Sequence, residues 1–106
     1  AVDILTAPGN ALYFSAISAY EILLKNRLGK LDLPIELITD LPREVLNAGW
    51  IERPISLSAS VMAARFPASH RDPFDRILAA QAIEAKIPVI SIDSALDSFG
   101  VTRVWK

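Results

Sequence analysis

The stretch that decides the fold is "DPFDRILAAQAIEAKIPVISID", residues 72–93. It opens like a helix: Asp72 is a good N-cap, Pro73 suits the first helical position, and Asp75 can reach back to the cap. It continues into a short apolar run that ends in Asp93 and predicts a buried strand of the parallel type. A long helix followed at once by such a strand indicates an α/β domain.

The rest of the chain shows the same alternation of strands and helices, with no internal repeat. We therefore expect one domain over residues 1–106, with a mostly parallel central sheet. Pro54 indicates that the strand around it lies at a sheet edge. Strands are predicted at 11–15, 50–56 and 101–106, helices at 18–30, at 34–49 with a break near Pro42, and at 58–66, and a turn or short helix at 94–100.

Composition narrows the classes of function. The chain has 106 residues and a formal net charge of −1, so no overall basic field favours non-specific nucleic-acid binding, and any contact with RNA must be local. It has no cysteine, which excludes disulfides and thiolate ligands and fits a reducing cytoplasm. No apolar run approaches the roughly 20 residues of a membrane span, so no membrane partner is predicted.

Two of the acids have a purely structural explanation. Asp75 and Glu21 each stand three residues after a helix-capping side chain, Asp72 and Ser18 respectively. Each pair has the form of a capping box, which contributes up to about 1 kcal/mol of stability. Taken alone, neither acid needs a further role.

A third acid favours a shared site. Asp93 ends a predicted buried strand, and ligands of open α/β sheets bind beyond the carboxyl ends of the strands, where the following helices begin. By chain direction, Glu21, Asp75 and Asp93 all map to that edge. Carboxylates gathered there repel one another, by roughly 4 kcal/mol for a pair about 4 Å apart at an effective dielectric of about 20. A hard divalent cation such as Mg²⁺ or Mn²⁺ offsets this repulsion and binds substrate phosphates.

Three segments of the chain resemble one protein family: "LYFSAISAYEILLKNRLGKLDLP" at 12–34, "FPASHRDPFDRILAAQAIEAKIPVISID" at 66–93 and "FGVTRVW" at 99–105. They are similar to VapC-like PIN-domain proteins, the ribonuclease toxins of bacterial toxin–antitoxin pairs. The resemblance implies a three-layer α/β/α fold around a parallel sheet, and Mg²⁺- or Mn²⁺-dependent cleavage of RNA. It also implies a cytoplasmic protein that forms a homodimer and has a VapB-like antitoxin as its partner.

The resemblance also assigns roles to individual residues. The catalytic and metal-binding acids carry over to Glu21, Asp75 and Asp93. Asp72 is expected to cap its helix and to support the site without touching the metal. Ser18 is expected to cap its own helix, among small side chains that leave the crevice open.

Several other side chains near these motifs admit two explanations. Arg71 and Arg76 are expected to hold RNA phosphate or an antitoxin carboxylate, although Arg76 is equally suited to pair with Asp72 one turn back. Lys25 belongs to a small basic rim for RNA, or simply stabilises the end of its helix. For His70, a pairing with Asp72 or with a backbone carbonyl is favoured over catalysis.

Apolar side chains are predicted to serve both a core and a partner surface. Trp50, Trp105, Phe66 and Phe74 are expected in the core, because a stacking platform for single-stranded RNA requires exposed rings beside basic residues. The segment 18–48 is more apolar than one buried face requires. In the family this region receives the antitoxin's C-terminal peptide and contributes to dimerisation, so part of it is expected to be a partner surface.

The beginning of the sequence departs from the family. Family members begin with a strand that ends in an aspartate, inside a pattern like "LLDTH", and this segment is absent here. Asp3 does not replace it, because "AVDIL" at 1–5 aligns with a helix. The absent strand lies mid-sheet, so both neighbouring strands are expected to lack partners. We therefore expect an N-terminally incomplete PIN-like domain, active as a ribonuclease in the full-length parent and impaired alone.

The sequence leaves three functions in competition. The first is a metal-dependent endoribonuclease toxin that cleaves RNA phosphodiester bonds and is inhibited by an antitoxin. The second is a catalytically inactive PIN-like domain that only binds an antitoxin or RNA. The third is a structural domain whose acids are only helix caps.

Overall fold

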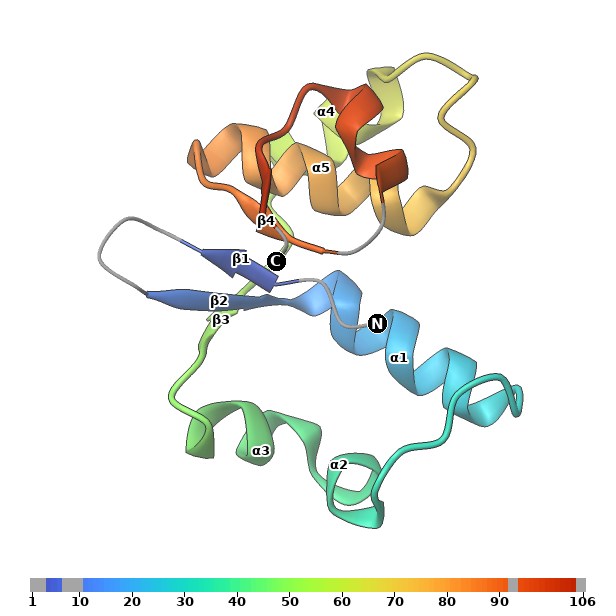
Figure 1. Ribbon diagram of the computed structural model, residues 1–106, viewed down its shortest axis with the longest axis vertical. Helices are drawn as coiled ribbons and strands as arrows, with labels where there is room; N and C mark the ends of the chain where they lie inside the picture. The colour runs from blue at the N-terminus through green and yellow to red at the C-terminus, as the bar shows by residue number, and fades with distance from the viewer. Residues whose placement is uncertain (1–3, 7–10, 92–93, 105–106) are drawn as a thin grey trace.

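The computed structural model describes residues 4–6, 11–91 and 94–104. Within them, five strands form a single sheet in the order β3-β2-β1-β4-β5 (Figure 1). β2 is parallel to β3, and β4 is parallel to β5. The strands are β1 (Ile4–Thr6), β2 (Leu12–Ser15), β3 (Ile51–Arg53), β4 (Val89–Ile90) and β5 (Arg103–Val104).

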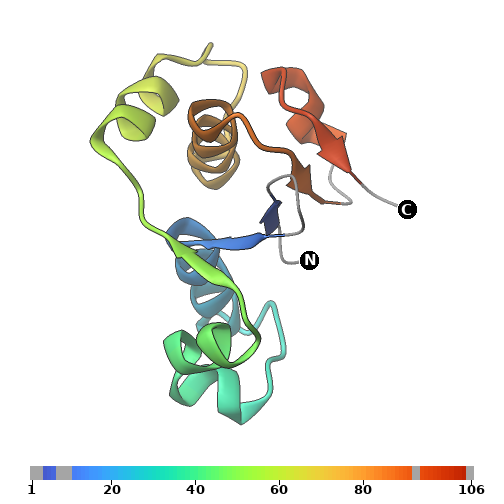
Figure 2. The same ribbon diagram turned by 90° about the vertical axis from the view of Figure 1, so that its left-hand side faces the viewer.

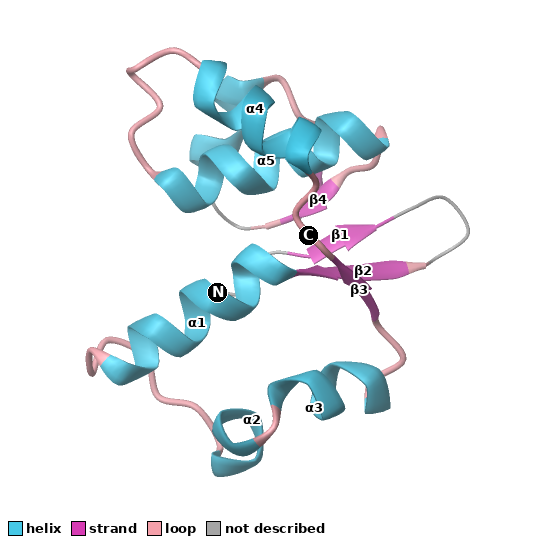
Figure 3. Ribbon diagram, turned by 180° about the vertical axis from the view of Figure 1, so that it is seen from behind, coloured by secondary structure: helices cyan, strands magenta, loops and turns pink. Residues whose placement is uncertain are grey.

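Helices cover both faces of this sheet. Figures 1 and 2 show α4 and α5 on one side of the strands and α1, α2 and α3 on the other, and Figure 3 shows the same arrangement from behind. The predicted three-layer α/β/α fold is therefore confirmed. Among the described residues, no helix combines the length and the apolar character needed to cross a bilayer. The helices are α1 (Ala16–Arg27), α2 (Ile35–Thr39), α3 (Leu41–Asn47), α4 (Leu57–Arg65), α5 (Pro73–Ala85) and the 3-10 helix η1 (Ser94–Phe99).

The middle position of the sheet is held by β1, which runs antiparallel to both of its neighbours. Leu5 stands opposite Tyr13 of β2 on one side and opposite Val89 of β4 on the other. The prediction that "AVDIL" ends a helix is therefore wrong for Ile4 and Leu5, and so is the expectation that the neighbouring strands lack a partner. The physical reason is that the facing edges of β2 and β4 carry main-chain groups that need hydrogen-bond partners.

Helix α1 begins earlier than the sequence predicts. Its N-cap is Ser15, the last residue of β2, whose Oγ accepts a hydrogen bond from the N–H of Ile17 at 3.1 Å. Ser18 is buried inside the first turn, so the predicted Ser18 cap and its capping box with Glu21 are both wrong. The strand passes into the helix without a loop, and this direct junction places the cap on the strand residue.

Other predicted helix boundaries are confirmed. Asp72 caps α5 by accepting from the N–H groups of Phe74, at 2.9 Å, and Asp75, at 3.4 Å. Pro73 occupies the first helical position, as the sequence indicates. The predicted break before Pro42 falls at the residue that caps α3, Asp40.

The middle of α5 is fully buried and carries the amide of Gln81. The amide oxygen accepts a hydrogen bond from Ser15 Oγ, at the junction of β2 and α1. The NH₂ group donates to the carbonyl of Pro54 at 3.2 Å and to that of Arg53 at 3.5 Å, at the end of β3. Because a buried amide is costly unless it is hydrogen-bonded, these contacts fix α5 against two strands at once.

One turn further along α5, Glu84 holds the start of α4. Its Oε2 accepts from the hydroxyl of Ser56, at 2.6 Å, and from that of Ser58, and its Oε1 lies 3.4 Å from Arg53 Nη2. Ser56 is also the N-cap of α4. The hydroxyl of Ser56, then that of Ser58 and the charge of Arg53, hold the pKa of Glu84 below its ordinary value of 4.5.

We expect this carboxylate to make stability depend on acid. Because its pKa is lowered by folding, the stabilisation is fully present above the ordinary value of 4.5 and is lost as the pH falls through the lower folded value. From neutral pH to pH below 4.5, the free energy of unfolding, measured by urea denaturation, should fall less in Glu84→Gln than in the wild type. Ser58→Ala, which keeps the carboxylate, should show an intermediate fall. Equal falls in all three proteins would contradict this role.

Candidate functional site

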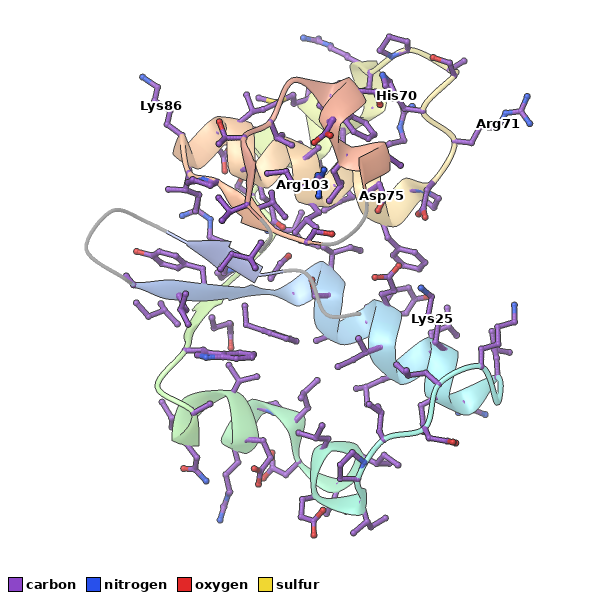
Figure 4. All side chains as sticks on the ribbon, in the orientation of Figure 1. Lys25, His70, Arg71, Asp75, Lys86 and Arg103 are labelled. Carbon is purple, nitrogen blue, oxygen red and sulfur yellow. The ribbon has the colours of Figure 1, made fainter. Side chains whose placement is uncertain are left out.

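The two described acids of the predicted site stand on α5 and α1. Asp75 is half-buried in the first turn of α5, behind the Asp72 cap. Figure 4 shows Asp75 at this end of α5, with Lys25 on α1 and Arg71 on the loop before α5. Glu21 lies in the second turn of α1 with only 15% of its side chain exposed, and its Oε2 is 3.3 Å from Lys25 Nζ.

An aromatic contact joins the helices that carry these acids. The ring of Tyr20 on α1 packs against the ring of Phe74 in the first turn of α5, with centroids 5.7 Å apart and planes tilted by 53°. Glu21 follows Tyr20 in the chain, and Asp75 follows Phe74. The contact therefore brings together the two backbone segments that bear the acids, as a shared site requires.

The third predicted acid, Asp93, lies outside the described residues. Within the part of the chain that the structure describes, no group of three histidine, aspartate or glutamate side chains is arranged to hold a metal ion. A three-carboxylate site thus depends on Asp93, and the role of all three acids stays a prediction. The donors that Glu21 and Asp75 offer are oxygens only, which suits Mg²⁺ or Mn²⁺ rather than a soft metal.

Arg76, the residue after Asp75, anchors the loop between α4 and α5. Within the described residues its guanidinium makes no ion pair with Asp72, so that predicted pairing is wrong. The side chain instead donates to four backbone carbonyls, one in the last turn of α4 and three in the loop that follows it. A contact of Arg76 with RNA stays a prediction. The four acceptors are the carbonyls of Ala64 (3.2 Å), Phe66 (2.8 Å), Pro67 (2.9 Å) and His70 (2.7 Å).

The imidazole of His70 closes the same loop against η1. It stacks on Phe99, with ring centroids 4.1 Å apart, and its Nδ1 lies 3.2 Å from Ser98 Oγ. Because the Ser98 hydroxyl donates its single hydrogen to the carbonyl of Ala95, it accepts from His70, whose Nδ1 is the donor in this contact. The predicted pairing of this side chain with Asp72 or a backbone carbonyl is wrong, because η1 lies over the loop and supplies the partner.

A cation that sequence reasoning missed holds the end of β4. Arg103 of β5 donates to both carboxylate oxygens of Asp97 in η1, at 2.8 and 3.2 Å, and to the carbonyl of Ser91 at 3.1 Å. The hydrogen bonds from Arg103, with its charge, hold the pKa of Asp97 below its ordinary value. No local pattern could reveal this bridge, because it depends on how η1 and β5 return to β4.

Two of the predicted RNA-binding cations are exposed. Arg71 extends from the loop before α5 (Figure 4). Half of the Lys25 side chain is exposed, and its ammonium group pairs with Glu21. These two side chains therefore offer positive charge to a ligand on the side of the molecule where the acids stand.

The aromatic side chains divide between a core and a surface. Phe66 packs on the apolar cluster between α4 and α5, as predicted. Phe74 is only half-buried, and its partner Tyr20 is 59% exposed, so this pair is not part of the core. Trp105 lies outside the described residues.

An apolar groove of about 700 Å³ runs between α1 and α3. Trp50, which was predicted in the core, is half-buried at its base and stacks on Phe14 with centroids 5.6 Å apart. Leu46 also lines the groove, although 74% of it is exposed. The charged side chains among the lining residues are Asp40, Arg43 and Glu52.

We expect Arg76→Lys to loosen the loop. A lysine ammonium lacks the planar fork that reaches four carbonyls, so some of them lose a charged donor, and the free energy of unfolding should fall by about 1–3 kcal/mol. Amide hydrogen exchange at His70, whose N–H donates to the carbonyl of Pro67, should accelerate. Arg71→Lys, on the same loop but exposed, is the matched control. Unchanged stability and exchange in Arg76→Lys would show that the carbonyl contacts contribute nothing.

Comparison with known proteins identifies one relationship. The family model described as PIN domain matches residues 1–101, which is most of the chain. No curated protein and no solved structure matches the chain.

Proposed function

The chain belongs to the PIN-domain family, and from this premise we propose that it is a metal-dependent endoribonuclease, the toxin of a type II toxin–antitoxin pair. PIN domains are generally metal-dependent nucleases. The observation that carries the proposal is the Tyr20–Phe74 contact, which joins the helices bearing Glu21 and Asp75. Together with Asp93, these acids are the proposed catalytic and metal-binding set.

The proposed ion is Mg²⁺ or Mn²⁺, held by carboxylate oxygens of Glu21, Asp75 and Asp93. When bound, it supplies an activated water and neutralises charge on the phosphate under attack. Positive charge lies beside both described acids. Lys25 places a positive charge 3.3 Å from Glu21, and the first turn of α5 places partial positive charge beside Asp75.

The remaining predicted side chains have supporting roles in this proposal. Asp72 caps α5 and so fixes the turn from which Asp75 projects. Arg71 and Lys25 are the side chains that we propose for holding the RNA backbone. Arg76 acts through the loop, because its guanidinium binds three carbonyls of the loop that carries Arg71 and one carbonyl at the end of α4.

A second function is favoured by one observation. Glu21 already has Lys25 as its cation, which reduces the need for a metal ion at that carboxylate. A PIN-like domain in which this pairing persists would bind RNA or an antitoxin without cutting it. The two functions differ in whether a divalent ion binds, and this difference can be measured.

The test is Asp75→Asn in the full natural protein. If Asp75 is a metal ligand, the substitution should lower Mn²⁺ affinity and the rate of RNA cleavage by roughly 100-fold or more, since even residues behind the metal ligands commonly contribute 10–100-fold. Its cost in stability should stay within about 1 kcal/mol. Mn²⁺ titration calorimetry and cleavage of a single-stranded RNA in the same buffer measure both effects.

Asp32→Asn, which removes an exposed acid far from α5 in the chain, is the control for charge alone. Cleavage that survives Asp75→Asn would sink the nuclease proposal. A wild-type protein that binds RNA, but does not bind Mn²⁺ and does not cleave RNA, would support the second function, a PIN-like domain that only binds.

We further propose that the apolar groove between α1 and α3 receives a peptide of the antitoxin. The apolar lining, which includes Trp50, suits one face of an amphipathic helix, and the charged lining residues can pair with the polar face of that helix. Most of the residues that line the groove belong to the segment 18–48, part of which the sequence predicts as a partner surface. Homodimer formation through the same region remains a prediction.

Leu46→Glu should weaken antitoxin binding. Its side chain lines the groove yet is 74% exposed, so a charge there is tolerated by the fold but opposes an apolar partner. The dissociation constant, measured by calorimetry, should rise at least about tenfold, equivalent to about 1.4 kcal/mol. Leu57→Glu, at an 82% exposed position on α4, is the matched control and should bind normally. If Leu46→Glu binds the antitoxin as tightly as the control does, the antitoxin does not bind in this groove.

A further inference from the structure

Tyr20 carries a large aromatic ring that the fold leaves more than half exposed. It is 59% exposed, whereas the fully buried residues of α1 are Ser18 and Ile22. The ring packs against Phe74, with centroids 5.7 Å apart. The ring is therefore held in a defined position without being buried.

This contact restricts the motion of the ring while preserving accessible area. An aromatic pair in tilted geometry is favourable beyond the area that it buries, so Tyr20 loses conformational freedom in the free protein. A ligand that packs on the open side then binds a ring that is already ordered, which lowers the entropic cost of binding. Flat, unsaturated ligands benefit most, because they can stack on an exposed aromatic ring.

The chemical surroundings of the ring select the ligand. Glu21 is the next residue in the chain, and Asp75 follows Phe74, so both proposed metal ligands adjoin the pair in sequence. Lys25 pairs with Glu21 at 3.3 Å, and Arg71 is exposed on the loop before α5. An exposed ring beside cations is the combination with which proteins bind single-stranded nucleic acid, the bases stacking on rings and the phosphates lying along cations.

We propose that the open face of Tyr20, held by Phe74, stacks an unpaired base of the RNA next to the phosphate that is cut. This inference takes its ligand, RNA, from the proposed function. It requires that the base at this position be unpaired, because a base within a duplex cannot offer its face to a side chain. It also predicts tolerance of base identity at that position, since every base has a face that can stack.

The test separates binding from cleavage. In the full natural protein with chelator present, the affinity for a single-stranded RNA oligomer is measured by fluorescence anisotropy, alongside an oligomer of the same length that lacks bases. Tyr20→Leu should weaken binding of the normal oligomer by about 5–150-fold, corresponding to about 1–3 kcal/mol for one stacked base. Tyr20→Phe keeps the ring and should bind within about twofold of the wild type.

The oligomer without bases distinguishes stacking from damage to the fold. Stacking requires that the wild type and Tyr20→Leu bind it equally, whereas a structural defect would weaken both oligomers alike and overturn the inference. If the wild type and Tyr20→Leu bind the normal oligomer equally and both cleave RNA in Mn²⁺, base stacking by Tyr20 is wrong and the nuclease proposal is unaffected. If RNA binding depends on the Tyr20 ring but the wild type does not cleave RNA in Mn²⁺, base stacking is supported and the nuclease proposal is wrong.

Discussion

The fold depends on one buried polar contact, between the hydroxyl of Ser15 and the amide of Gln81. The same amide donates to the carbonyls of Arg53 and Pro54, so a single side chain in the middle of α5 binds the ends of β2 and β3. An amide in this apolar setting is strongly unfavourable if any partner is lost. It therefore allows only one placement of α5 along the strands, and thereby fixes where the first turn of α5 meets α1.

The consequences of that placement appear at the N-terminal end of α5. Asp72 caps the helix, Asp75 projects from its first turn, and Arg76 turns back to hold the preceding loop by its carbonyls. His70 then closes this loop against η1 through Phe99. Charged side chains thus serve the architecture as much as any ligand, and Arg76 is the clearest case. Its four acceptors are neutral carbonyls, so none of them offsets the positive charge that the guanidinium brings to this region.

The candidate site could be predicted in part. Capping residues and the hydrophobic pattern predict the helices that carry Glu21 and Asp75. Their convergence was predicted because, in an α/β sheet, helices begin beyond the carboxyl ends of the strands, at one edge of the sheet. The contact that joins them, between Tyr20 and Phe74, has no signature in the sequence, because neither residue differs from an ordinary apolar helix position. The same holds for Arg103, which reaches Asp97 and the end of β4 only once the last strand has returned to the sheet.

The sequence by itself determined where most elements begin and end. Asp72 and Pro73 start α5, Ser56 starts α4 and Asp40 separates α2 from α3, because capping acts within one turn of the backbone. Only the tertiary structure decided that β1 runs antiparallel in the middle of the sheet and that Ser15, rather than Ser18, caps α1. In the first case the cause is distant in sequence, because β1 pairs with main-chain groups of β2 and β4. In the second case β2 passes directly into α1, so the cap falls on Ser15, whose hydroxyl also donates to an amide 66 positions away.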